Sequence, residues 1–282
     1  MKIETCDIFG ANNKPITLDI FLSKKETKQP IIIFCHGYKG FKDWGAWHLV
    51  GKHFAEAGFN FIKFNFSHNG TTPDQPKDFV DLNAFGNNNY MKEVYDLGKV
   101  IDWVEQNQEF ENYFDTSKIY LIGHSRGGGI AIIRSAIDDR VKKLVTWASV
   151  SDFHHRLIPD ERGLKKWKED GAIYVKNART GQELPHYYQF YESLQENKDL
   201  LNLEKQTKSI IQPMLIIHGD ADEAVAIDEA KNLALWNPKA KVIIISDGTH
   251  TFKTNHPWKD QELSDQLKEV VNETLLFMGN IF

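Results

Sequence analysis

The chain has 282 residues, a formal net charge of −5 and an isoelectric point near 6.1. Apolar residues make up 41% and charged residues 26% of the sequence, as in ordinary soluble globular proteins. The acidic balance gives no basic field for nucleic acid and no polybasic face for a membrane, so neither is an expected partner. We expect a small-molecule partner, and the sequence leaves the oligomeric state open between monomer and homodimer.

The N-terminal stretch has no apolar run of the length found in secretory signals, and no stretch approaches the roughly 18 apolar residues of a membrane span. The two cysteines, Cys6 and Cys35, do not form a disulfide framework. Cys35 ends the apolar run IIIFC, which is typical of a buried strand thiol. We therefore expect a cytoplasmic protein.

Short β-rich runs alternate with longer amphipathic stretches, which favours βαβ units and a mostly parallel sheet flanked by helices, an α/β fold. Near the start, IETCDIF and PITLDIFL alternate about a GANNKP turn and predict an antiparallel hairpin. The expected buried strands are 31–35, 59–66, 118–125, 142–149, 213–219 and 241–246. The expected helices are 47–57, 90–107, 260–276 and one opened by GGGIAIIRSAI after strand 118–125.

One long segment departs from this alternation of strands and helices. Residues 151–208 have no buried-strand pattern and are rich in charge and in aromatic side chains. Loops of that length inside a compact domain are usually functional or form a subdomain. We predict a core of residues 1–150 and 209–282, with a helical cap or lid (151–208) inserted between the sixth and seventh strands, over the carboxyl ends of the strands.

The strongest chemical signal is Gly123-His124-Ser125-Arg126-Gly127, a G-x-S-x-G pattern between a predicted strand and a predicted helix. Such a sharp turn lifts the serine hydroxyl above the sheet edge, and the flanking glycines remove side chains that would collide with backbone. The helix N-terminus favours developing negative charge. We therefore predict that Ser125 is a nucleophile, rather than the cap of a glycine-rich turn or part of a dinucleotide site.

A serine nucleophile needs a base, and the base needs an orienting acid. In a parallel sheet these groups lie on loops after later strands, in the order Ser, Asp, His. Asp220 and Asp222 compete for the acid, and H-G-x-x-D-x-x-V favours Asp222, which lies past the strand tip. His250 follows a strand and a D-G turn, so it is favoured over His256 as the base.

Acyl transfer also needs N–H groups that stabilise the negative carbonyl oxygen. We expect one from Arg126, directly after the nucleophile, and one from Tyr38 in the loop after strand 31–35, where Gly37 lets the backbone turn inward. His36 and His218 both precede glycine at strand ends, and we expect them to bond loop backbone rather than to act in catalysis.

With a strand-HG-Y segment, G-H-S-R-G, H-G-x-x-D-x-x-V and G-T-H in this order, the sequence resembles the α/β-hydrolase superfamily over about residues 30–275. Within it, the chain is similar to bacterial esterases related to dienelactone hydrolases, cinnamoyl and feruloyl esterases and serine aminopeptidase-like hydrolases. The resemblance implies the α/β-hydrolase fold, the triad, the oxyanion pair and the cap named above. Two positions depart from these relatives: Arg126 replaces a common glutamine, and Ser125 replaces the cysteine of dienelactone hydrolases proper.

We therefore expect a hydrolase that cleaves a small soluble carboxylic ester through an acyl-enzyme on Ser125, with no metal or organic cofactor. A peptidase or thioesterase with the same triad, an acyltransferase, and a binding protein on this fold remain alternatives.

The cap is rich in aromatic side chains, which either clasp a planar acyl group or form a small core of the cap itself. Three of its lysines either attract a carboxylated substrate or form a solvated helix face. The aromatic residues are Trp167, Tyr174, His186, Tyr187, Tyr188, Phe190 and Tyr191, and the lysines are Lys165, Lys166 and Lys168.

Overall fold

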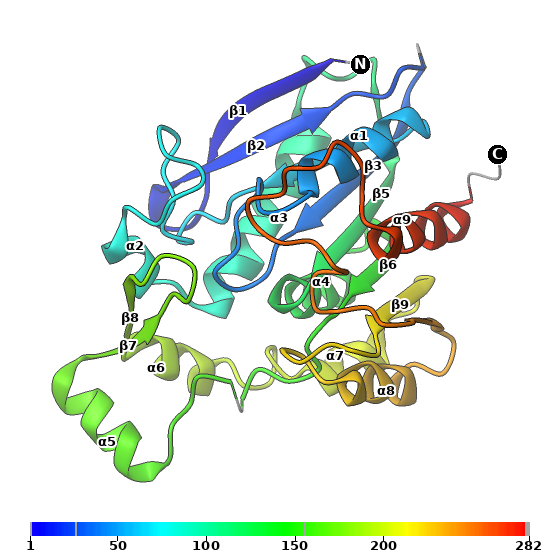
Figure 1. Cartoon of the computed structure of the whole chain (residues 1–282). Helices are drawn as coiled ribbons and strands as arrows, with labels where there is room; N and C mark the ends of the chain where they lie inside the picture. The colour runs from blue at the N-terminus through cyan, green and yellow to red at the C-terminus, as the bar shows by residue number, and fades with distance from the viewer. Residues whose placement is uncertain (1, 26, 155, 280–282) are drawn as a thin grey trace.

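A computed structural model describes residues 2–25, 27–154 and 156–279. Its main feature is an eight-stranded sheet in the order β1-β2-β4-β3-β5-β6-β9-β10 (Figure 1). These strands are β1 (Ile3–Phe9), β2 (Pro15–Phe21), β3 (Gln29–Cys35), β4 (Asn60–Phe64), β5 (Phe114–His124), β6 (Val141–Trp147), β9 (Met214–Gly219) and β10 (Lys241–Ile245). The predicted N-terminal hairpin is confirmed, because β1 pairs antiparallel with β2.

From β4 to β10 all neighbouring strands pair in parallel, whereas β2 joins β4 antiparallel. The predicted α/β class with a mostly parallel sheet is therefore confirmed. The carboxyl ends of the parallel strands meet at one edge, where loops from distant parts of the chain come together.

Helices cover both faces of this sheet. They are α1 (Trp47–Glu56), α2 (Leu82–Gly86), α3 (Tyr90–Gln106), α4 (Arg126–Ile137), α5 (Glu161–Asp170), α6 (Gln189–Glu196), α7 (Leu203–Ser209), α8 (Ile227–Trp236) and α9 (Asp265–Met278). Alternation along β3 sends Ile31 and Ile33 to the face covered by α3 and α4, and Ile32 and Phe34 to the face covered by α1 and α9. Both faces are thus apolar, as the continuous run IIIFC predicts.

The last helix starts later than the sequence pattern indicates. Ser264 caps it, because its Oγ accepts a hydrogen bond from the N–H of Leu267, so the residues before it form an irregular segment. The helix α8 follows β9, and the sequence analysis did not predict it.

Between β6 and β9 the chain leaves the main sheet (Figure 1). We predicted a helical segment here, and the structure adds an antiparallel hairpin of β7 (Ala172–Lys176) and β8 (Glu183–Tyr187) between α5 and α6. The hairpin packs against α2, and α6 packs against α3. At the end of the segment, α7 packs on the core helices α4 and α8. Within the described ranges, no helix is both long and apolar enough to span a bilayer.

Four charged side chains, three of them buried and Asp43 partly exposed, connect the loop after β3 to the sheet. The Nζ of Lys42 lies 2.7 Å from Asp19 and 2.8 Å from Asp43, and Lys63 also pairs with both carboxylates. Although burial works against their charge, the two lysines hold the pKa of both carboxyls below its usual range. Because Asp19 is on β2 and Lys63 on β4, this cluster fixes the loop that leads from β3 to α1.

Replacing Lys63 with methionine should lower the free energy of unfolding by about 3–5 kcal/mol, since it leaves buried carboxylates short of a partner. Lys24→Met is the matched control, because the exposed Lys24–Glu56 pair contributes at most about 1 kcal/mol. Urea unfolding of both variants measures the difference. Equal stabilities would show that the buried cluster contributes no more than a surface pair.

Candidate active site

Ser125 lies at the junction of β5 and α4 in a strained backbone conformation, with φ 57° and ψ −123°. Glycines make this turn possible. A Cβ on Gly123 would lie 2.3 Å from the carbonyl oxygen of Gly127, and a Cβ on Gly127 would lie 2.4 Å from that of Cys35. The predicted strand-turn-helix setting of Ser125 is thus present in the structure.

The structure brings together the three side chains predicted as nucleophile, base and acid. His250 Nε2 lies 3.0 Å from Ser125 Oγ, and His250 Nδ1 lies 2.8 Å from Asp222 Oδ2. With the proton on Nδ1, His250 donates to Asp222 and accepts from the serine hydroxyl.

Asp222 is held as a buried carboxylate. Its side chain is fully buried, and its Oδ1 accepts hydrogen bonds from the N–H groups of Ala224 and Val225. Although burial opposes its charge, His218 and His250 hold the pKa of Asp222 well below its usual range. The alternative acid, Asp220, is exposed at the strand end.

The other histidines near this edge make backbone contacts. His36 Nδ1 lies 2.9 Å from the carbonyl oxygen of Gly37, and His218 Nε2 lies 2.9 Å from that of Val225. The alternative base, His256, accepts a hydrogen bond from the N–H of Gly45. A partner that the sequence analysis missed is His124, whose Nε2 lies 2.8 Å from the carbonyl oxygen of His250 and so braces the loop that carries this residue.

The turn after β3 approaches the elbow closely. A Cβ on Gly37 would lie 2.8 Å from the Cβ of Ser125, so only glycine fits there. The next residue, Tyr38, lines the same cavities as Ser125, and Arg126 follows Ser125 as the first residue of α4. Within the described residues, neither the N–H of Tyr38 nor that of Arg126 has a hydrogen-bond acceptor in the protein.

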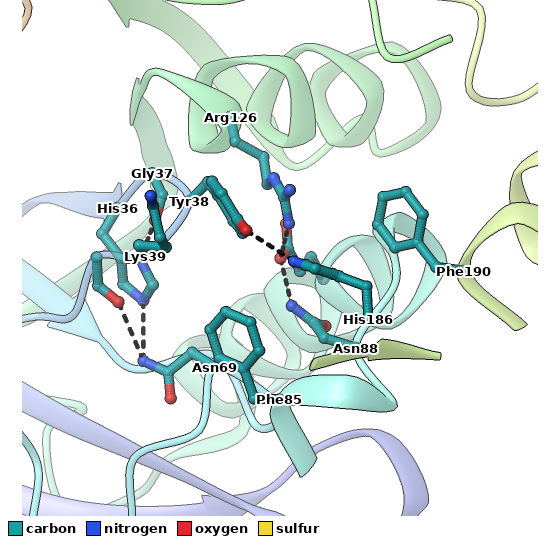
Figure 2. Close-up of a pocket in the computed structure, with 12 residues that line it drawn as sticks. His36, Gly37, Tyr38, Lys39, Asn69, Phe85, Asn88, Arg126, His186 and Phe190 are labelled. Carbon is teal, nitrogen blue, oxygen red and sulfur yellow. Dashed lines mark hydrogen bonds and ion pairs between the residues drawn. The ribbon is translucent and has the colours of Figure 1, made fainter. Parts of the chain in front are cut away.

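The side chain of Arg126 does not extend into solvent (Figure 2). Its guanidinium lies 4.3 Å from the ring centre of Tyr38 and 5.0 Å from that of Tyr90, and its Nη1 lies 3.4 Å from Glu93 Oε1. Asn88 donates a second hydrogen bond to the same Glu93 oxygen. The sequence analysis missed Glu93, which sits on the predicted helix 90–107 with no local signal of an arginine partner.

The hydroxyl of Tyr38 reaches the inserted hairpin (Figure 2). It lies 2.7 Å from Nε2 of His186 on β8. Burial lowers the pKa of His186 to about 3, so its ring is neutral near pH 7 and its Nε2 accepts a hydrogen bond from the tyrosine hydroxyl. Because Tyr38 follows Gly37, which approaches Ser125 closely, this bond links the inserted segment to the turn beside the elbow.

Two cavities meet at Ser125 and His250. The first, called here the tryptophan cavity, has a volume of about 450 Å³ and lies between Trp44, Trp47 and the turn Asn177–Arg179 of the inserted hairpin. The second, called here the valine cavity, has a volume of about 460 Å³ and is lined by Val150, Leu157 and Val225. Tyr38 and Lys39 border both cavities.

Three of the seven aromatic residues named for the inserted segment, Trp167, His186 and Phe190, are buried, and Tyr187, Tyr188 and Tyr191 are partly exposed. Trp167 is fully buried, stacks on Phe190 and donates its indole N–H to the carbonyl oxygen of His186. Tyr174 is exposed. The lysines of α5 lie on an exposed face, where Lys165 and Lys166 pair with acidic residues one turn away. No group of three or more potential metal ligands is found among the described residues.

A mostly parallel sheet with a serine at a strand-helix elbow, followed by Asp and His on later loops, defines an α/β hydrolase. The family model for the alpha/beta hydrolase fold matches residues 30–204, more than half of the chain. The chain therefore belongs to this family.

Among curated relatives, the "Uncharacterized 31.7 kDa protein in traX-finO intergenic region" of Escherichia coli is 28% identical over 137 residues, which are 49% of this chain and 43% of that protein. This chain therefore spans less than half the length of that relative.

Two solved structures share the fold over nearly all of both chains. The esterase domain of a Rhodothermus marinus protein matches with a TM-score of 0.65 and 17% identity, covering 98% of each chain. Est1E from Butyrivibrio proteoclasticus with ferulic acid bound matches with a TM-score of 0.73 and 18% identity, covering 97% of each chain. At these identities the likeness shows a common fold.

The strained backbone at Ser125 predicts that glycine at this position gives a more stable protein than alanine. Ser125→Gly should be more stable to urea than Ser125→Ala by about 1 kcal/mol, because relief of a positive φ outweighs the added entropy of the unfolded glycine. At Ser149, whose φ is not positive, glycine should instead be less stable than alanine. The same order at both positions would show that the elbow stores no strain.

Proposed function

We propose that this protein is a serine carboxylesterase that acts on a small soluble ester. The observation that carries this proposal is the hydrogen-bonded chain from Ser125 through His250 to Asp222, placed where two cavities meet. One cavity suits the acyl group and the other the alcohol, so the carbonyl carbon would lie at the serine hydroxyl.

In this mechanism His250 Nε2 takes the hydroxyl proton as Ser125 Oγ attacks the ester carbonyl carbon. Asp222 stays ionised, fixes the Nδ1–H tautomer and stabilises the imidazolium that forms. Collapse of the tetrahedral intermediate breaks the bond to the alcohol, which leaves with the proton from His250. Water, deprotonated by the same nitrogen, then releases the acid and restores Ser125.

The oxyanion of each tetrahedral intermediate would be stabilised by the N–H groups of Tyr38 and Arg126. Arg126 directly follows Ser125, Tyr38 follows Gly37, which approaches Ser125 closely, and neither N–H has an acceptor in the described part of the protein. Pre-oriented donors of this kind need no rearrangement during the reaction, and loss of one typically lowers the rate ~10²–10³-fold. The inserted segment acts as a cap in this proposal, because its β7–β8 turn forms one wall of the tryptophan cavity.

Hydrolysis of p-nitrophenyl esters from acetyl to octanoyl tests the nucleophile and the acid. Ser125→Ala should lower kcat by roughly 10⁶-fold, and Asp222→Asn by roughly 10⁴-fold because His250 loses its orienting carboxylate. Asp220→Asn is the matched control and should retain wild-type rates, since its side chain is exposed. Equal slow hydrolysis by wild type and Ser125→Ala would favour a binding protein on this fold instead.

Tyr38→Phe tests whether the bond to His186 positions the oxyanion donor. The substitution keeps the ring and the N–H but frees the turn after β3 from β8, so kcat should fall about 10-fold with little change in KM. Tyr187→Phe is the control, because that hydroxyl contacts Asn83 on an exposed surface. A change in KM alone would instead assign the Tyr38 hydroxyl to substrate binding.

A further inference from the structure

The lysine and arginine side chains that border the two cavities are positive, whereas the net charge of the protein is negative. The chain carries a net charge of −5, yet in the part of the chain that the structure describes neither cavity lining includes an aspartate or a glutamate. Lys39 borders both cavities, Arg179 borders the tryptophan cavity, and Arg126 and Arg156 border the valine cavity. An anion that enters the site would therefore meet an attractive field.

Two of these four cations lack an acidic partner. Arg156 lies 2.5 Å from Glu229 Oε1 and Arg126 lies 3.4 Å from Glu93 Oε1, so both of these charges are already paired. Over the described ranges, neither Lys39 nor Arg179 forms an ion pair, and each instead lies near an aromatic ring, that of Tyr38 at 5.3 Å and that of Phe41 at 5.8 Å. Asp43, on the same loop as Lys39, is already paired with two lysines.

Lys39 is held at this place by the turn after β3. Its backbone is left-handed, with φ 54°, and the N–H of Gly40 closes the turn on the carbonyl oxygen of Gly37. The side chain is about half-buried, and burial lowers the pKa of the amine. A desolvated cation without a partner favours an anionic ligand, because an incoming carboxylate restores the interactions that burial removes.

We propose that the ester cleaved at Ser125 carries a free carboxylate, which Lys39 and Arg179 bind in the tryptophan cavity. The inference rests on the proposed esterase function and adds its substrate class. The guanidinium of Arg179 can pair with a carboxylate through two parallel N–H bonds, and the ammonium of Lys39 supplies a point charge in the same cavity. The walls formed by Trp44 and Trp47 suit the apolar part of the molecule.

Two matched pairs of esters test the preference on either side of the scissile bond. Monomethyl glutarate against dimethyl glutarate places the carboxylate on the acyl side, and 3-acetoxybenzoate against its methyl ester places it on the alcohol side. The readout is the ratio of kcat/KM for the anionic ester to kcat/KM for the neutral one. A substitution that lowers the activity toward both esters equally leaves this ratio unchanged. We expect a ratio above about 10 in one pair, falling as sodium chloride screens the attraction.

Lys39→Gln and Arg179→Gln should each lower that ratio about 10-fold. Lys165→Gln is the matched control, because this lysine is exposed on α5 and pairs with Glu169, so the ratio should stay at the wild-type value. Arg179 is itself exposed on a hairpin turn, so its variant should fold normally. A preference for the neutral ester in both pairs, or a ratio unchanged in both variants, would overturn the proposal.

Calorimetry on Ser125→Ala tests the carboxylate site without turnover. This variant should bind 3-acetoxybenzoate or monomethyl glutarate at least about 10-fold more tightly than the matching neutral ester, and Arg179→Gln should abolish the difference. If wild type hydrolyses none of the esters while this selective binding persists, the esterase proposal fails and the carboxylate site stands. If hydrolysis is fast and serine-dependent but binding shows no preference for the anion, the carboxylate proposal alone fails.

Discussion

The site depends on the close approach of two backbone segments, the turn after β3 and the elbow after β5. Gly37 faces the Cβ of Ser125 at a separation that leaves no room for another Cβ. Such an approach must be held by contacts outside the turn, because glycine itself favours many conformations. On one side the turn continues into the loop fixed by Lys42, Asp43 and Lys63. On the other side the ring of Tyr38 lies under the guanidinium of Arg126.

Arg126 accordingly has two separate tasks. Its backbone N–H begins α4 beside Ser125, while its side chain turns inward to Tyr38, Tyr90 and Glu93. This contact joins the side chains of the two residues whose N–H groups are proposed to stabilise the oxyanion. A glutamine at this position, common in the esterases that the sequence resembles, has no guanidinium plane with which to hold the tyrosine ring in this way.

The parts of the molecule that sequence could predict are those encoded locally. Apolar runs predict the parallel strands, and a glycine-flanked serine between a strand and a helix predicts the elbow. The candidates Ser125, Asp222 and His250 therefore follow from pattern and chain order alone.

The hairpin β7–β8 was missed because its strands are short and β8 contains Pro185. It is held instead by a distant contact, in which Leu184 packs on Phe41, Phe79 and Phe85. The helix α8 was missed because it buries little besides Ala230 and Leu233, a weak helical signal. That Lys39 and Arg179 line the same cavity likewise depends on the position of the hairpin.

The proposed triad and part of the cavity wall come from different segments of the chain. Ser125, His250 and Asp222 all lie on loops of the core sheet, whereas Arg179 and the adjoining wall of the tryptophan cavity come from the inserted segment. The inserted segment also contacts the turn after β3, through the hydrogen bond between His186 and Tyr38. Because Arg179 is exposed on the hairpin turn while Lys39 lies on the core turn after β3, a substitution at Arg179 would alter the proposed carboxylate site with little effect on stability. Under the proposed mechanism, a change at β8 that breaks the contact with Tyr38 would instead lower the rate for anionic and neutral esters alike.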